Sequence, residues 1–93
     1  MLDLVQTSTF KKNLKKYKHK SSILDELDYI VELLVHEKQI PQKYKNHFLT
    51  GKFQKYTNVQ ELHLKPDDLL VYLKIENHSI TLLAIGSHAD LFG

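Results

Sequence analysis

The chain has 93 residues, of which 42% are hydrophobic and 26% charged, so it fits one folded domain spanning residues 1–93. It contains no cysteine, which excludes disulfide bonds and a thiolate zinc site. The N-terminus lacks the pattern of a signal peptide, and no apolar run reaches the roughly 20 residues of a membrane-spanning helix, so we expect a cytoplasmic protein with no membrane partner.

The first half of the chain predicts a short strand followed by two helices. Residues 2–6 alternate as a strand does, and Thr7 or Ser8 is expected to cap the first helix. The core-facing residues of that helix recur with helical spacing: Phe10, Leu14 and Tyr17. Ser21 or Ser22 is expected to cap the second helix. Its apolar residues also recur with helical period: Ile23, Leu24, Leu27, Ile30, Val31, Leu34 and Val35.

The second half predicts a loop and then a set of strands. Residues 38–52 are polar and contain Pro41 and Gly51, as in a loop. Four candidate strands follow, at 53–57, 59–65, 69–75 and 80–85. Segregated helices followed by consecutive strands favour an α+β fold, with two N-terminal helices packed on one face of an antiparallel sheet of four to five strands.

The charges are almost balanced overall, at a formal net charge of +2, but the lysines are clustered. One basic group lies in the first helix and the turn after it: Lys11, Lys12, Lys15, Lys16, Lys18 and Lys20. A second group follows the acidic second helix: Lys38, Lys43, Lys45, Lys52 and Lys55. Such clusters can bind phosphate, although a lysine-rich helix can equally be a solvated face. Because no basic residue is arginine, any RNA contact is expected to position the backbone without reading bases.

Three histidines are candidates for catalysis. His47 lies in the second basic group, His63 lies on the polar side of a predicted strand, and His88 follows the last strand. Asp67 lies in the turn after His63, so these residues could converge at one end of the sheet. Each alone is also compatible with an ordinary surface role, and three histidines with an aspartate could instead bind zinc. No HExxH or similarly tight pair is present, which favours chemistry without a metal.

Two histidines and nearby lysines satisfy the requirements of RNA transesterification. Since the pKa of free histidine is about 6.5, it can remove the 2′-hydroxyl proton or protonate the leaving 5′-oxygen near neutral pH. Lysines can stabilise the charged phosphorane, and no cofactor is needed because the nucleophile is part of the RNA. Phe92, near the C-terminus, could pack into the core or stack on a base.

Three segments, in order, resemble the toxins of the RelE/YafQ group. Residues 44–53, with Tyr44-Lys45, His47, Gly51 and Phe53, are similar to a YafQ segment in which tryptophan is usual at the aromatic position. HLKPDDLLVYL, residues 63–73, and GSHADLFG, residues 86–93, resemble the strand and the tail of the same group. The specific motifs therefore lie within 44–93, while the helical half resembles the family only in its pattern.

The resemblance implies a role for each matching residue. His88 would be a main proton-transfer residue, assisted by His47 and His63. Asp67 would orient a histidine or contact the substrate, and Phe92 would help to place the nucleotide. The RelE branch relies on Arg and Lys for charge stabilisation; in this arginine-free chain Lys52 and Lys55 are the expected substitutes.

The resemblance also implies a function and partners. Members of the group are bacterial toxins that cleave mRNA in the A site of the 30S ribosomal subunit, where rRNA holds the message. They are neutralised by a cognate antitoxin, often of the ribbon-helix-helix type, and an acidic binding segment would suit the basic surface of this chain. Two alternatives remain open: a gyrase-inhibiting toxin of the ParE kind, which shares the fold, and a non-catalytic RNA- or partner-binding module.

Overall fold

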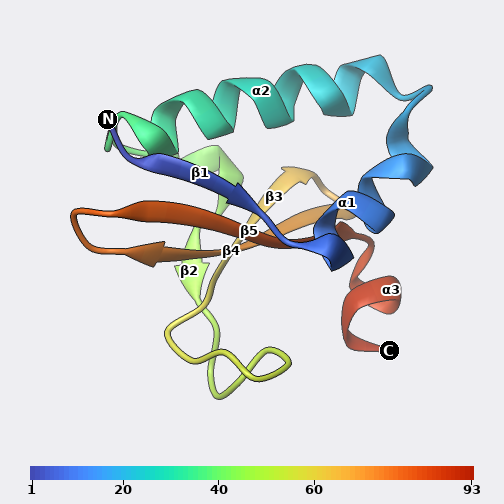
Figure 1. Cartoon of the computed structure of the whole chain (residues 1–93). Coiled ribbons are helices and arrows are strands. Elements are labelled where there is room, and N and C mark those ends of the chain that lie inside the picture. Colours follow the sequence, from blue (N-terminus) through green and yellow to red (C-terminus); the bar gives the residue numbers. More distant parts are fainter.

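The computed structural model describes all 93 residues, which form a single sheet with helices packed against it (Figure 1). In chain order the elements are β1 (Asp3–Gln6), α1 (Ser8–Leu14), η1 (Lys15–Tyr17), α2 (Ser21–Val35), η2 (Gln42–Tyr44), β2 (His47–Phe48), β3 (Gln60–Lys65), β4 (Asp68–Ile75), β5 (Ser79–Gly86) and α3 (His88–Phe92). Helix α2 crosses one face of the sheet, whereas the loop of residues 49–58 and α3 lie on the other side (Figure 1). None of the helices is both long and apolar enough to cross a membrane.

The sheet has five strands in the order β1-β5-β4-β3-β2, and it is mixed. The expected α+β class and the strand number are confirmed, but the expectation of a wholly antiparallel sheet is wrong. Strands β2 to β5 are antiparallel to their neighbours, whereas β1 runs parallel to β5, with Asp3 opposite Ser79 and Gln6 opposite Leu82. A parallel pair requires a long connection, and here the two helices and the other strands provide it.

The first helix begins as its sequence predicts. The Thr7 hydroxyl accepts a hydrogen bond of 3.1 Å from the backbone N–H of Phe10, and the same hydroxyl donates to the Leu82 carbonyl of β5. The cap predicted for the second helix is wrong: Lys20 occupies the N-cap position of α2 without a side-chain bond, and Ser21 is already helical. Backbone bonds from Ile23 and Leu24 to the Lys20 carbonyl close this first turn instead.

Two hydrophobic clusters lie on the two faces of the sheet. The larger cluster joins α1, η1 and α2 to the sheet and contains Phe10, Ile30, Leu62 and Tyr72. The smaller cluster lies on the opposite face: Phe53, Val59, Val71, Leu83 and Ala84, with Leu49, Tyr56, Leu73 and Leu91 packed against it. The 49–58 loop and α3 therefore cover the second face, and they bring the C-terminal residues close to that loop.

The segment before β3 differs from its prediction. The strand expected at 53–57 is absent; Phe53 and Tyr56 form only an isolated bridge, and Gln54 and Asn58 adopt positive φ angles of 54° and 58° that end any extended run. Residues 38–52 were expected to be loop throughout, but His47–Phe48 forms β2 against Glu61 and Gln60. The other strands begin or end within a residue of their predicted limits.

The C-terminal residues form a helical turn that the strand pattern does not predict. Ser87 accepts from the backbone N–H of Asp90 at 3.0 Å, and the Asp90 carboxylate accepts from the Ser87 backbone N–H at 3.3 Å. This reciprocal pair is a capping box, which satisfies two donors at the start of α3. The helical turn carries His88 on its first residue and Phe92 on its last.

Candidate active site

The centre of the candidate site is an ion pair between neighbouring strands. His47 of β2 and Glu61 of β3 are directly opposite each other, and Nε2 of His47 lies 3.0 Å from Oε2 of Glu61. Glu61 is only 7% exposed, and it is the one charged residue among those that are buried. Its second oxygen, Oε1, is buried without a hydrogen-bond partner. The pair therefore places an acceptor-rich carboxylate beneath an exposed imidazole.

Both ring nitrogens of His47 face acceptors. Nδ1 lies 2.7 Å from the Lys45 carbonyl oxygen, which can only accept, so Nδ1 donates. Nε2, on the other side of the ring, lies 3.0 Å from Oε2 of Glu61. The imidazole of His47 is thus held between the Lys45 carbonyl and the Glu61 carboxylate.

A cavity of about 290 Å³ links this pair to the C-terminal helix. Glu61, His88, Phe92 and Lys52 line it, together with Leu49 and Thr50. The rings of His88 and Phe92 lie 5.1 Å apart, and Phe92 packs edge-on against the buried ring of Phe53 at 5.7 Å. Phe92 is still 41% exposed, so one side of its ring is open to a ligand. Four of the residues predicted for the site, His47, His88, Phe92 and Lys52, therefore gather around Glu61.

His63 lies farther along the same strand. It is two residues after Glu61 on β3 and shares its side of the sheet, which separates their Cα atoms by about 6.6 Å. Its Nδ1 is 3.3 Å from the Pro66 carbonyl oxygen. The half-buried ring lines a separate edge cavity with Lys43, Lys45 and Lys65. His63 thus flanks the main cavity and is surrounded by lysines.

The last two predicted residues, Asp67 and Lys55, lie at the margin of the candidate site. Asp67 is exposed in the β3–β4 turn, and no side-chain hydrogen bond joins it to a histidine; the predicted orienting contact is absent here. Lys55 lies in the 49–58 loop, where its ammonium group stands 5.7 Å from the centre of the Tyr56 ring. Their contribution to substrate binding remains a prediction.

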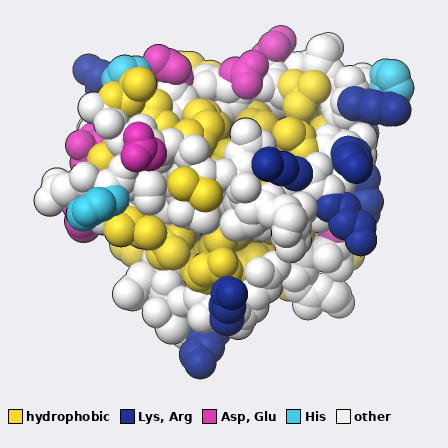
Figure 2. All heavy atoms as spheres, viewed as in Figure 1, with side chains coloured by type: hydrophobic (Ala, Val, Ile, Leu, Met, Phe, Trp, Pro, Cys, Tyr) yellow, Lys and Arg dark blue, Asp and Glu magenta, His cyan; other side chains and the backbone are white.

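Lysine side chains gather in two places on the face seen in Figure 2. One group overlies α1 and the turn that follows it, and the other lies on the 49–58 loop below the sheet (Figure 2). The charges around α3 are coupled to the first group, because Lys16 and Lys20 help to lower the pKa of Asp90. The hydrogen bonds from Ser87 are the main cause of that lowering.

A second polar contact fixes the segment that leads to His47. The Tyr44 hydroxyl donates to Glu26 of α2 at 2.5 Å, and Lys65 of β3 lies 3.9 Å from the same carboxylate. Burial, followed by the bond to Glu26, raises the pKa of Tyr44 to about 12. Tyr44 therefore anchors η2 to α2 three residues before His47.

Sequence reasoning missed Glu61 as a site residue. Its alternation with Leu62 correctly predicts that it points away from the main core. Its burial follows from β2 and the 49–58 loop, which precede β3 in the chain and fold back beside it. An available signal is its position two residues before His63 on the same side of the strand.

Solved structures share this architecture along the whole chain. The chain is similar to a metal-bound toxin from Helicobacter pylori, with 35% identity, 99% of this chain and 100% of that chain covered, and a TM-score of 0.87. It is also similar to a chain of the E. coli DinJ–YafQ complex, with 26% identity, full coverage of both chains and a TM-score of 0.84. YafQ from E. coli strain BL21(DE3) matches with the same identity, coverage and TM-score. The mixed five-stranded sheet with its helices is therefore the RelE/YafQ-like fold.

The family follows from the sequence match. Residues 2–93 match the model of YafQ, the bacterial toxin of a type II toxin–antitoxin system. This chain belongs to that family of toxins. No curated protein sequence matches it. Metal binding is a property of the H. pylori structure; in this chain no three His, Asp or Glu side chains are grouped closely enough to hold a metal ion.

Proposed function

We propose that this toxin is an endoribonuclease that cleaves translated mRNA in the ribosomal A site and so inhibits translation. The observation that carries the proposal is the cavity in which His88, Phe92 and Lys52 surround the Glu61 carboxylate, itself paired with His47. It combines two proton-transfer groups, a cation and an open aromatic face. Neither a gyrase inhibitor nor a passive binding module needs this combination.

The proposed reaction is an internal transesterification of the RNA. One histidine removes the proton of the 2′-hydroxyl, the 2′-oxygen attacks the adjacent phosphorus, and the bond from phosphorus to the 5′-oxygen breaks. A second histidine protonates that leaving oxygen, so the products are a 2′,3′-cyclic phosphate and a 5′-hydroxyl. Each positioned acid or base contributes roughly 10²–10⁴-fold in rate. His88 and the His47–Glu61 pair are the proposed proton-transfer groups, and His63 assists them.

The remaining residues position the substrate. Lys52 lines the cavity and Lys55 follows it on the same loop, so both can attract the phosphates without reading bases. The open side of Phe92 can stack on one base. Asp67, exposed in the turn after His63, is proposed to contact the RNA or to orient His63 when substrate binds.

The open character of the site supports a role for the ribosome. His47 and His88 are exposed, and the cavity of about 290 Å³ has room for little more than one nucleotide. Such a site holds a flexible RNA poorly, whereas rRNA in the A site would hold the message in a reactive geometry. The reaction needs no metal, because the nucleophile is part of the RNA itself. In the cell, an antitoxin encoded with the toxin would suppress the activity, as the DinJ–YafQ complex suggests.

The test is a cell-free translation assay in which the 5′ ends of a defined mRNA are mapped by primer extension. Wild type is compared with His88→Ala and His63→Ala, with and without ribosomes and with and without a chelator. His78→Ala is the matched control, because the side chain of this exposed histidine bonds only to the Glu76 carbonyl in the β4–β5 turn. We expect cuts only on translated mRNA, and we expect the chelator to leave them unchanged. The cuts should disappear with His88→Ala and His63→Ala and remain with His78→Ala. Folded protein that stops growth without cutting mRNA would reject the nuclease and favour a target such as gyrase.

A further inference from the structure

A second, larger cavity lies on the other face of the sheet, away from the candidate active site. It has a volume of about 430 Å³ and lies where the C-terminal end of α2 and the segment of residues 37–46 meet β3, β4 and β5. Its floor contains Leu34, Tyr72 and Ile80, which belong to the helix-side core. Glu61 points to the opposite face, so an occupant of this cavity does not compete for the histidine site.

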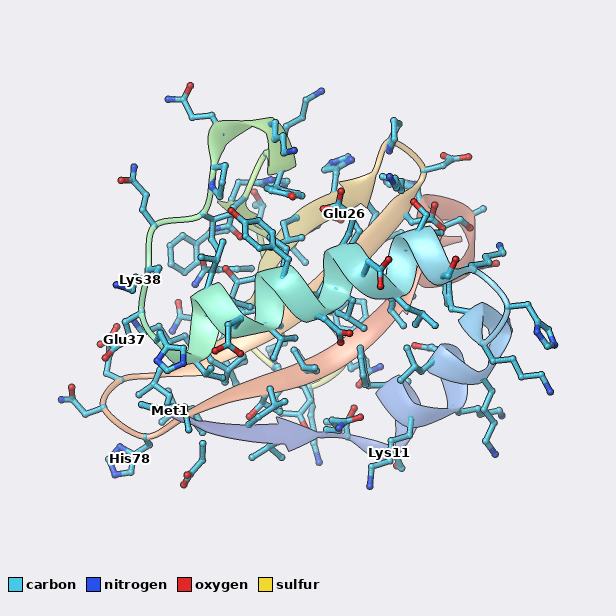
Figure 3. The ribbon with its side chains drawn as sticks, turned by 90° about the horizontal axis from the view of Figure 1, so that it is seen from above. Met1, Lys11, Glu26, Glu37, Lys38 and His78 are labelled. Atoms are coloured by element: carbon cyan, nitrogen blue, oxygen red, sulfur yellow. The ribbon has the colours of Figure 1, made fainter.

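The rim of the cavity is basic. Lys38, Lys45 and Lys74 line it with one acidic residue, Glu37. Lys74 pairs with Glu37 at 3.2 Å, whereas Lys38 and Lys45 form no ion pair. The lining therefore carries two uncompensated positive charges. Figure 3 shows Glu37 and Lys38 next to each other on the segment that leaves α2, far from Lys11 of α1.

The walls carry aliphatic and amide side chains. Ile40 and Pro41 extend the apolar floor, while Asn46 and Gln60 are joined to the Tyr72 hydroxyl by hydrogen bonds of 2.7 and 3.1 Å. Amides donate and accept, so they suit the backbone of a peptide. The only aromatic ring in the lining, Tyr72, is almost fully buried and offers no face on which a base could stack.

We propose that this cavity binds an acidic segment of the cognate antitoxin whose carboxylates pair with Lys38 and Lys45 and whose apolar side chains fill the floor beside Ile40. This proposal rests on the antitoxin partner of the proposed function, and it does not depend on nuclease activity. A cavity of this size accepts a short amphipathic stretch rather than a whole domain. The segment would bind behind β2 and β3, against Asn46 and Gln60, which precede His47 and Glu61 in the chain.

The test uses the full-length toxin and fluorescein-labelled peptides that tile the antitoxin encoded beside the toxin gene. Binding is measured by fluorescence anisotropy for wild type, for Lys38→Glu and for Lys38→Glu/Lys74→Glu. Lys11→Glu/Lys15→Glu is the matched control, with the same change of charge on exposed residues of the first basic group. For the tightest acidic peptide we expect Kd to rise about tenfold or more in the cavity variants and no more than about threefold in the control.

Any other pattern would overturn the proposal. One such pattern is that the cavity variants bind all peptides as wild type does. Another is that the control variant weakens binding equally, which would indicate a general charge effect. Binding by the intact antitoxin but by none of its peptides would also reject a segment that fills the cavity. A single-stranded RNA of mixed sequence is titrated in parallel, and selective loss of RNA binding in the cavity variants would make this a nucleic-acid site. Thermal melts check folding; Lys38→Glu alone replaces the double variant if loss of the Lys74–Glu37 pair unfolds it.

Discussion

The carboxylate of Glu61 lies 3.0 Å from the His47 imidazole on the neighbouring strand, while its other oxygen is buried without a partner. Leaving such an oxygen unsatisfied costs about 1–3 kcal/mol or more for a charged group. An apolar residue at this position would avoid that cost, since the residues on either side belong to a well-packed sheet. The carboxylate therefore contributes less to the stability of the fold than to the electrostatic environment of the His47 imidazole.

The first prediction is that Glu61→Gln impairs catalysis without impairing binding. Glutamine keeps the shape of the side chain but removes the negative charge that lies 3.0 Å from Nε2 of His47. We expect the cleavage rate at saturating toxin to fall about 10²-fold, with little change in the toxin concentration that gives half the maximal rate. The ¹⁵N chemical shifts of the His47 ring should change, because Nε2 loses its charged partner.

Two companion variants make that experiment decisive. Glu61→Asp should recover part of the rate, because it restores the carboxylate at a greater distance. Glu76→Gln removes a carboxylate from the exposed β4–β5 turn and should behave as wild type. A Glu61→Gln toxin with a normal rate and unchanged His47 signals would show that the carboxylate has no part in the reaction.

The second prediction concerns stability. Replacing Glu61 by leucine removes the unpaired oxygen and adds apolar volume beside the small cluster that contains Val59 and Val71. We expect the free energy of unfolding to rise by about 1 kcal/mol, since buried ionic groups are often less stabilising than apolar ones. Urea denaturation at neutral pH measures this change, and the same protein should fail to cleave mRNA. A destabilised Glu61→Leu protein would contradict the view that this carboxylate is kept for function.

The sequence named most of the residues of the candidate site but not the surroundings that bring them together. The histidines and Phe92 could be identified because their order along the chain resembles that of a known group. The burial of Glu61 beside His47 could not be predicted, because it depends on two features that the sequence pattern does not show. Strand β2 has only two residues, too few to show a period, and the loop that covers Glu61 is held by Phe53 packing into a distant cluster.

The same limits apply to the fold. The sequence predicted β3, β4 and β5 closely, because alternation in β3 and continuous apolar runs in β4 and β5 are local properties of each strand. Pairing is not local: the β1 sequence shows a strand but not its parallel alignment with β5. Residues 53–57 have the composition of a strand, yet Phe53 and Tyr56 close a turn instead. The helix α3 did have a signal, because Ser87 and Asp90 are spaced as a capping box, but five residues are too few for a periodic pattern.

The third prediction tests whether that capping box positions the site. Ser87→Ala removes the acceptor for the Asp90 backbone N–H, which costs about 1 kcal/mol at a typical N-cap. We expect α3 to fray, Phe92 to leave the ring of Phe53 and mRNA cleavage to decrease severalfold. Amide hydrogen exchange of residues 88–93 should accelerate, while exchange in β4 stays unchanged. Equal protection of these residues in variant and wild type would show that packing of α3 alone maintains the helix.

The capping box also predicts a pH dependence. Hydrogen bonds from Ser87 lower the pKa of Asp90, so the folded pKa lies below the unfolded one. The carboxylate therefore stabilises α3 above the unfolded value of about 4, and this contribution is lost as the pH falls through the folded pKa. In acid, wild type and Asp90→Asn should converge in their exchange rates at α3, whereas at neutral pH the variant should exchange faster. Asp28→Asn, an exposed change on α2, is the control and should show no difference at α3.

The fourth prediction concerns the bond between Tyr44 and Glu26, which ties η2 to α2. Tyr44→Phe keeps the buried ring and removes a hydrogen bond to a charged group, a change that costs about 1.5–3 kcal/mol. The segment from Tyr44 to His47 should loosen, so we expect both lower stability and slower cleavage. Tyr56→Phe, in the 49–58 loop, is the matched control and should change neither by much.

The stability difference should depend on pH with a definite sign. Burial and Glu26 raise the pKa of Tyr44 from 10.0 to about 12, so the neutral hydroxyl stabilises the folded state fully below pH 10. That contribution is lost as the pH rises to about 12, because the unfolded chain ionises first. Wild type should therefore lose more stability than Tyr44→Phe as the pH rises over this interval. Tyr17 and Tyr72 are present in both proteins, so their own raised pKa values cancel in the comparison. The measurement is urea unfolding of both proteins at pH 8 and pH 11. An equal difference in the free energy of unfolding at the two pH values would contradict the prediction, because an ionised Tyr44 cannot donate a hydrogen bond to the Glu26 carboxylate.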